Sequence, residues 1–119
     1  MNVILAKTAG FCFGVKRAVD TVYRELARED GGKIYTYGPI IHNEEVIRDI
    51  EQRGAVVLRT EDELDAVAGG TVIIRSHGVE KRICDKLKSK HISIVDATCP
   101  YVKKIHNIVQ KESEKGNYI

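Results

Sequence analysis

The first cysteine of the chain lies within the segment Thr8-Ala9-Gly10-Phe11-Cys12-Phe13-Gly14-Val15-Lys16-Arg17. An apolar run at residues 3–6 precedes this segment and predicts a strand, and apolar residues at helical spacing after it predict a helix over residues 15–29. Cys12 is therefore expected on a tight turn between a strand and a helix, where Gly10 and Gly14 allow the backbone to bend. Gly31 and Gly32 are expected to end the helix.

The position of Cys12 suits a metal-bound or chemically reactive sulfur. A helix N-terminus favours the thiolate over the thiol, and Lys16 and Arg17 add positive charge nearby. In open α/β sheets, ligands bind beyond the carboxyl ends of the strands, which is where such a turn lies. Taken alone, Cys12 is explained equally well as a buried structural cysteine.

Strands and helices are predicted to alternate along the rest of the chain. The predicted strands lie at residues 34–37, 55–58, 71–75 and 92–95, and each is followed by apolar residues at helical spacing. Capping signals mark helix starts at Asn43, at Thr60 with Glu63, and at Pro100, which puts Cys99 at or near an N-cap. This alternation predicts an α/β fold, a parallel sheet with flanking helices.

Length and composition indicate a small globular domain. The chain has 119 residues, a net charge of +2 and scattered lysines and arginines, which argues against a nucleic-acid-binding protein. No apolar run is long enough to span a membrane or to serve as a secretory signal, so a cytoplasmic protein is expected. The three cysteines include no Cys-x-x-Cys pair, which disfavours a disulfide framework, a thioredoxin-type dithiol and a local zinc knuckle.

Four residues with metal- or anion-binding side chains share one position in the predicted fold. Cys12, His42, His77 and Cys99 each follow a predicted strand and precede a predicted helix. In a parallel sheet all such turns lie at one edge, so these side chains are expected to converge. Thiolates, imidazoles and helix N-termini together favour a metal and an anion as ligands.

Each of these four residues also has an ordinary structural explanation, as a loop histidine or a buried cysteine, and the identity of the ligand stays open. Zinc accepts two cysteines and two histidines, although structural zinc sites usually have tight local spacing. An iron–sulfur cluster accepts cysteines from distant turns but usually needs three or four. The residues alone predict a metal or phosphate site at the edge of an α/β sheet. Structural or surface positions are expected for Cys84, His91, Asp96 and His106.

Four segments resemble, in the same order, motifs of the 4-hydroxy-3-methylbut-2-enyl diphosphate reductase family, which catalyses the last step of the non-mevalonate isoprenoid pathway. They are Ala9-Gly10-Phe11-Cys12-Phe13-Gly14-Val15, Gly38-Pro39-Ile40-Ile41-His42-Asn43, Arg75-Ser76-His77-Gly78-Val79 and Asp96-Ala97-Thr98-Cys99-Pro100. The resemblance covers the whole chain but only the first part of the family's length.

The resemblance implies one lobe of a three-lobed α/β enzyme built around a [4Fe-4S] cluster. Residues 1–97 match the first lobe, and residues 98–119 match the start of the second. Cys12 and Cys99 match two of the three cysteines that hold the cluster in this family. His42 and His77 match two histidines that bind the diphosphate of the substrate.

The reaction of the family removes a hydroxyl group from 4-hydroxy-3-methylbut-2-enyl diphosphate as water and gives isopentenyl and dimethylallyl diphosphates. The resemblance implies an external electron donor such as ferredoxin or flavodoxin, and no nucleic-acid or membrane partner. The third cluster cysteine, a third diphosphate-binding histidine and the proton-delivering glutamate match positions beyond residue 119, and Cys84 does not match the third cysteine. The chain alone is therefore expected to be inactive, and its last helix is expected to lack packing partners.

Two other functions remain open on the same residues. The first is a zinc-dependent hydrolase or a zinc-stabilised domain that uses the cysteines and histidines together. The second is a phosphate-binding module without redox chemistry, which would need only the pocket of His42 and His77.

Overall fold

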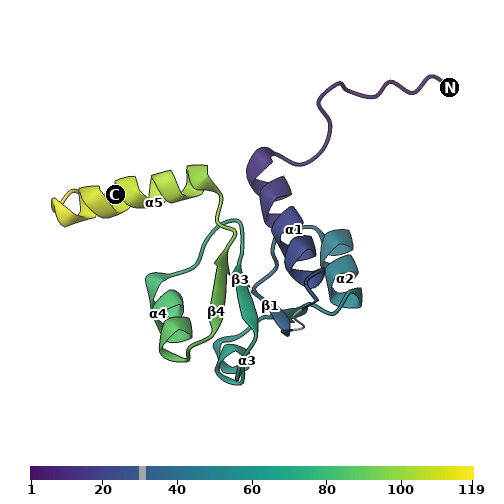
Figure 1. The fold of residues 1–119 in the computed structure, drawn as a ribbon. Coiled ribbons are helices and arrows are strands. Elements are labelled where there is room, and N and C mark those ends of the chain that lie inside the picture. Colours follow the sequence, from purple (N-terminus) through teal and green to yellow (C-terminus); the bar gives the residue numbers. More distant parts are fainter. Residues whose placement is uncertain (30–31) are drawn as a thin grey trace.

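The computed structural model describes residues 1–29 and 32–119. Helices and strands alternate along these residues, as Figure 1 shows. Their order is α1 (Phe13–Leu26), β1 (Ile34–Tyr37), α2 (Glu44–Gln52), β2 (Val56–Leu58), α3 (Glu61–Asp65), β3 (Thr71–Ile74), α4 (Lys81–Ser89), β4 (Ser93–Asp96) and α5 (Pro100–Glu114). The first helix begins and ends earlier than its apolar spacing predicts, and the expected stop at Gly31 lies outside the described residues.

The strands form one parallel sheet of four strands in the order β2-β1-β3-β4. Tyr35 of β1 pairs with Val56 on one side and with Val72 on the other, so β1 and β3 are the central strands. The predicted α/β fold with a parallel sheet and flanking helices is therefore confirmed.

Two apolar layers cover the two faces of the sheet. Ile73 of β3 packs in a buried cluster with residues of α1 and α2, such as Val22 and Ile50. Its neighbour Val72 faces the opposite way and packs in a second cluster with residues of α3 and α4, such as Leu64. Each fully buried aliphatic side chain of this kind contributes about 1.5–3 kcal/mol to the free energy of folding.

The strand predicted at residues 3–6 does not form. Residues 1–12 contain neither helix nor strand, and Val3, Ile4 and Leu5 are 83%, 92% and 83% exposed. Figure 1 shows this segment running from the start of α1 away from the sheet. A strand needs backbone hydrogen bonds from a neighbouring strand, and the segment pairs with none of the strands described.

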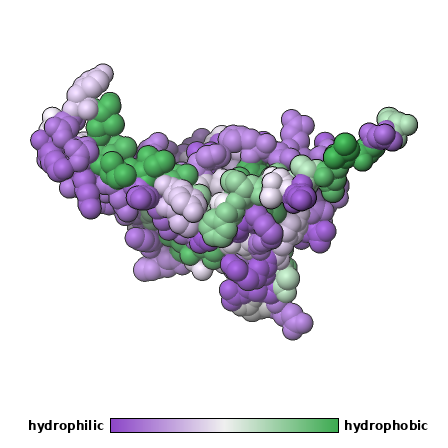
Figure 2. All heavy atoms as spheres, turned by 90° about the horizontal axis from the view of Figure 1, so that it is seen from above, coloured by the Kyte–Doolittle hydropathy of each residue, from purple (hydrophilic) through white to green (hydrophobic). Residues whose placement is uncertain are grey.

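The last helix forms where the sequence predicts it, but its apolar stripe is exposed to solvent. None of the residues of α5 is buried, and Tyr101, Ile105 and Ile108 are 70%, 57% and 52% exposed. Figure 2 shows hydrophobic atoms along the arm that α5 makes, and also along the N-terminal arm. Among residues 1–29 and 32–119, no element therefore covers the apolar stripe of this helix.

The predicted caps fix where the helices begin. Asn43 precedes α2 and its Oδ1 accepts a hydrogen bond of 3.0 Å from the backbone N–H of Val46. Thr60 and Glu63 form the predicted capping box of α3. Cys99 is the N-cap residue of α5, with Pro100 at its first position. These caps place the loops that carry His42 and Cys99 at the carboxyl ends of β1 and β4.

Candidate functional site

His42, His77 and Cys99 lie at one edge of the sheet, in the connections that follow β1, β3 and β4. All four strands are parallel, so these connections leave the sheet at the same edge. Cys12 is the N-cap residue of α1, as predicted for a residue before a helix. The prediction that it follows a strand was wrong, because residues 1–12 form none.

The two histidines face each other. Their ring centroids are 5.2 Å apart, and the ring planes are inclined by 42°. Both rings line a hollow of about 270 Å³, together with Asn43, the buried Ser76 and the exposed Phe11 from the segment before α1. Imidazole nitrogens can donate hydrogen bonds, so a hollow lined by two histidines suits an anion.

Backbone hydrogen bonds join the three connections side by side. The N–H of Ser76 donates to the carbonyl oxygen of Ile40 at 3.3 Å, and the N–H of Cys99 donates to the carbonyl oxygen of Ser76 at 2.9 Å. Ile40 lies two residues before His42, and Ser76 lies directly before His77. The loops that carry His42, His77 and Cys99 are therefore fixed relative to one another by main-chain contacts.

The first turn of α1 packs directly against Cys99. A Cβ atom built on Gly14 would overlap Cys99 Sγ and would lie 2.9 Å from Cys99 Cβ, which makes glycine necessary at this position. Cys12 lies just before this turn and is exposed, whereas Cys99 is partly buried. The two cysteines that the sequence predicts to act together thus lie at neighbouring helix N-termini.

A second set of contacts anchors the connection between β4 and α5. Arg17 Nη1 donates a hydrogen bond of 3.1 Å to the carbonyl oxygen of Thr98. Asp96 Oδ1 accepts from the N–H of Thr98 at 2.9 Å, and Asp96 Oδ2 pairs with Lys103 Nζ at 2.6 Å. Burial of the Asp96 carboxyl is the largest influence and opposes ionisation, but hydrogen bonds from Lys103 and Thr98 outweigh it and lower the pKa. Asp96 therefore stabilises the turn, as predicted.

Of the remaining candidates, Cys84 stands apart from this arrangement, whereas His106 lies close to it. Cys84 lies on α4 and is partly buried, and its burial, followed by the nearby charge of Asp96, raises the pKa of its thiol. A protonated thiol is a poor metal ligand. His106 on α5 is exposed, as expected, but its ring approaches Gly78 and lines a shallow hollow with Arg75 and His77. Nothing in the sequence pattern indicated this approach, because it depends on the direction in which α5 leaves the sheet.

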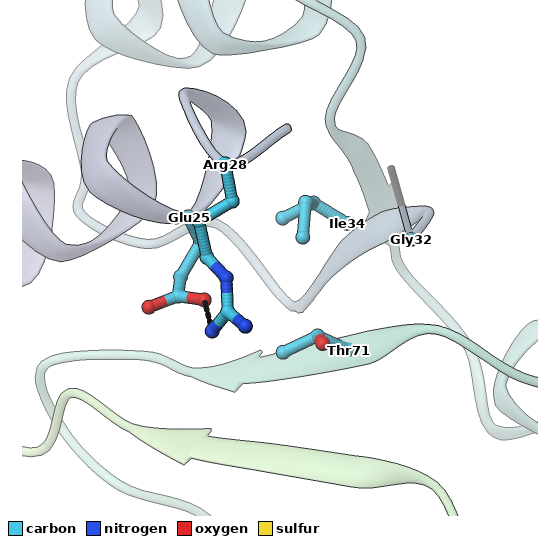
Figure 3. A pocket seen from close by; sticks show the side chains of 5 residues that line it. All are labelled: Glu25, Arg28, Gly32, Ile34 and Thr71. Carbon is cyan, nitrogen blue, oxygen red and sulfur yellow. Dashed lines mark hydrogen bonds and ion pairs between the residues drawn. The ribbon is translucent and has the colours of Figure 1, made fainter. Parts of the chain in front are cut away.

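A separate pocket of about 100 Å³ lies at the opposite edge of the sheet, where β1 and β3 begin. Figure 3 shows its lining, with the buried carboxylate of Glu25 paired at 3.1 Å to Arg28 Nη1 beside Ile34 and Thr71. None of the predicted site residues lines this pocket. The ion pair joins two residues three apart at the end of α1, which is a structural role.

The donor atoms at the main site fit an iron–sulfur cluster in part. Cys12 and Cys99 are the residues that would hold such a cluster, because sulfur is the ligand it takes and both lie at neighbouring helix N-termini. Within residues 1–29 and 32–119, no group of three or more cysteine, histidine or carboxylate side chains is arranged to hold a metal ion. Over the same residues, no helix combines the length and apolar character needed to cross a membrane.

Comparison with known proteins gives a consistent result. The sequence matches the model of the family described as "LytB protein" over residues 3–119. It is 50% identical over 117 residues to the 4-hydroxy-3-methylbut-2-enyl diphosphate reductase of Thermoanaerobacter sp. strain X514, covering 98% of this chain and 40% of the relative. It is 47% identical over 119 residues to the enzyme of the same name from Alkaliphilus oremlandii, covering 100% of this chain and 42% of the relative.

Two solved structures share the fold. The reductase of Plasmodium falciparum superposes with a TM-score of 0.80 at 34% identity, covering 92% of this chain and 33% of that one. A second structure is titled as (E)-4-hydroxy-3-methyl-but-2-enyl diphosphate reductase, the terminal enzyme of the non-mevalonate pathway. It superposes with a TM-score of 0.79 at 42% identity, covering 98% of this chain and 40% of that one. The chain spans about 40% of the length of the curated relatives it matches. On the family match across almost all of its residues, this chain belongs to the LytB protein family.

Proposed function

We propose that residues 1–119 form the N-terminal part of an iron–sulfur reductase. The complete enzyme removes the hydroxyl group of 4-hydroxy-3-methylbut-2-enyl diphosphate as water and yields isopentenyl and dimethylallyl diphosphates. The observation that carries this proposal is the meeting of two cysteine-bearing helix N-termini and a histidine pair at one edge of the sheet. The names of the relatives supply the substrate.

In this proposal His42 and His77 bind the diphosphate. Their rings lie 5.2 Å apart at the same hollow, so two imidazole N–H groups can donate to oxygens of one diphosphate. Hydrogen bonds to a charged acceptor are stronger than those between neutral groups, which favours a diphosphate over a neutral ligand.

Cys12 and Cys99 are proposed as two ligands of a [4Fe-4S] cluster. Each sulfur belongs to the N-cap residue of a helix, where the aligned peptide dipoles favour the thiolate. When bound, the cluster supplies the electrons for the reduction and a Lewis-acidic iron. Gly14 leaves space for Cys99 Sγ beside α1. The remaining ligand and the proton donor are proposed to come from outside residues 1–119.

We further propose that residues 1–97 are the first lobe of the enzyme and that residues 98–119 begin the second. The buried clusters include Ala97 but no residue of α5, which supports a boundary at this point. An external electron carrier such as ferredoxin or flavodoxin, and a cytoplasmic location, complete the proposal.

Metal analysis of the complete protein tests this function. The protein that carries residues 1–119 is purified under anaerobic conditions, assayed for iron, sulfide and zinc, and supplied with substrate and a strong one-electron donor. Iron with sulfide, and formation of the two five-carbon diphosphates, are expected. Zinc without sulfide would support the zinc-dependent alternative, and phosphate binding without either metal would support the binding module.

A further inference from the structure

One arginine links the two cysteine-bearing helix N-termini. Arg17 lies on the second turn of α1, the helix that Cys12 caps, and its guanidinium donates to the carbonyl oxygen of Thr98 at 3.1 Å. Thr98 is 4% exposed and directly precedes Cys99. The hydrogen bond spans 81 residues of sequence, so it joins two parts of the chain that only the fold brings together.

The bonded carbonyl belongs to the peptide unit that enters Cys99. The carbonyl group of Thr98 and the N–H group of Cys99 are parts of the same planar unit. Its oxygen accepts from Arg17, and its N–H donates to the carbonyl oxygen of Ser76 at 2.9 Å. Both polar groups of this peptide are therefore fixed, from α1 on one side and from the connection after β3 on the other. This holds the peptide plane that leads into Cys99.

Arg17 and Gly14 act on the same surface of α1. Residues three apart on a helix lie on one face, and here both contact the β4–α5 connection. Gly14 permits the approach of Cys99 Sγ, while Arg17 holds the peptide before it. The hydrogen bond from Arg17 is made to the backbone and not to the sulfur of Cys99, which packs against Gly14.

We propose that Arg17 is a positioning residue for the iron–sulfur cluster. It acts through the Thr98–Cys99 peptide and sets the placement of the Cys99 sulfur relative to the helix that Cys12 caps. This inference rests on the proposed function, in which both cysteines bind the cluster. Groups that orient metal ligands in this way typically change metal affinity by about 10- to 100-fold when they are removed.

The test compares four forms of the complete enzyme after anaerobic reconstitution: wild type, Arg17→Ala, Arg17→Lys and Arg24→Ala. Arg24 is the matched control, because it is an arginine on the same helix with a side chain that is 68% exposed and bonded within α1 to Thr21 and Glu25. The measurements are the rate of iron release to a chelator, the electron spin resonance spectrum of the reduced cluster, and the thermal unfolding of each protein.

Arg17→Ala is expected to release iron about 10-fold faster than wild type and to alter the spin resonance spectrum. Arg17→Lys is expected to restore part of the iron retention, because its ammonium group can donate to the same carbonyl. Arg24→Ala is expected to match wild type. A purely structural role would lower the unfolding temperature of Arg17→Ala while leaving the spectrum unchanged, and that result would overturn the inference.

Failure of the inference and failure of the proposed function give different results. A wild-type protein without iron and sulfide would overturn both. A wild type that holds the cluster, with Arg17→Ala indistinguishable from Arg24→Ala, would overturn only the role of Arg17. If Arg17→Ala does not fold, Arg17→Met takes its place, because methionine keeps the aliphatic part of the side chain but cannot donate to the Thr98 carbonyl. A wild-type rate of iron release and a wild-type spectrum in Arg17→Met would overturn the positioning role.

Discussion

The rings of His42 and His77 lie 5.2 Å apart although they come from connections that follow two different strands. Strands β1 and β3 are hydrogen-bonded neighbours in the sheet, with Tyr37 paired to Ile74 at their carboxyl ends. The neighbouring strands therefore bring the two connections together, and the hydrogen bond from the N–H of Ser76 to the carbonyl oxygen of Ile40 holds them side by side.

Replacement of either histidine should weaken substrate binding and leave the cluster in place. In the complete enzyme, His42→Ala and His77→Ala are each expected to raise KM about 10- to 100-fold, since one charge-assisted hydrogen bond contributes about 1.5–3 kcal/mol. The measurement is KM together with iron content. Loss of iron from either variant would identify that histidine as a metal ligand and favour the zinc-dependent alternative.

The placement of these histidines was predictable, because it follows from a local signal. Each lies just after an apolar run, and parallel strands bring all such positions to one edge. The alternation of strands and helices was predictable for the same reason. The prediction of a strand at residues 3–6 was wrong, because the apolar pattern is local while strand formation depends on a partner elsewhere. The hydrogen bond from Arg17 to Thr98 could not be predicted from the sequence. Which arginine contacts this carbonyl oxygen depends on how the fold brings together residues 81 positions apart.

Gly14→Ala should disrupt the placement of Cys99. A glycine to alanine change inside a helix normally stabilises it by about 0.5–1 kcal/mol, but here the new Cβ overlaps Cys99 Sγ. The expected result is reduced iron content and lower stability toward denaturant. Gly69→Ala is the matched control, because no atom lies within 4 Å of a Cβ at that position. Equal iron content in the two variants would show that Cys99 can move without consequence.

Cys84→Ala should leave the cluster and the turnover of the complete enzyme nearly unchanged. The Cys84 thiol lies on α4 and its pKa is raised by burial, so it is protonated at neutral pH. The expected cost is a modest loss of packing, about 1 kcal/mol or less. Iron content and denaturant unfolding check this, with Cys12→Ala as the comparison. A loss of iron as large as that of Cys12→Ala would make Cys84 a cluster ligand.

The turn before Cys99 should weaken in acid. The pKa of Asp96 in the folded chain is lower than its ordinary value of 3.8, so its ionised form stabilises the fold above that pH. This contribution is lost as the pH falls below about 3.8 and the carboxyl becomes protonated. Asp96→Asn should therefore unfold at a lower temperature than wild type at neutral pH. In acid the unfolding temperatures of the two proteins should lie closer together. An equal difference between the two proteins at all pH values would contradict this.

Residues 1–119 alone should neither retain a [4Fe-4S] cluster nor reduce the substrate. The two ligands proposed within residues 1–119, Cys12 and Cys99, would leave two of four irons without a protein thiolate, and Cys12 is exposed at an edge open to water and oxygen. The apolar face of α5, with Ile105 and Ile108 more than half exposed, also lies unburied beside this edge. The test reconstitutes residues 1–119 and the complete enzyme side by side under anaerobic conditions, then records visible and spin resonance spectra and product formation. A stable cluster with full activity in the short chain would show that the ligand set and the proton donor proposed here are wrong.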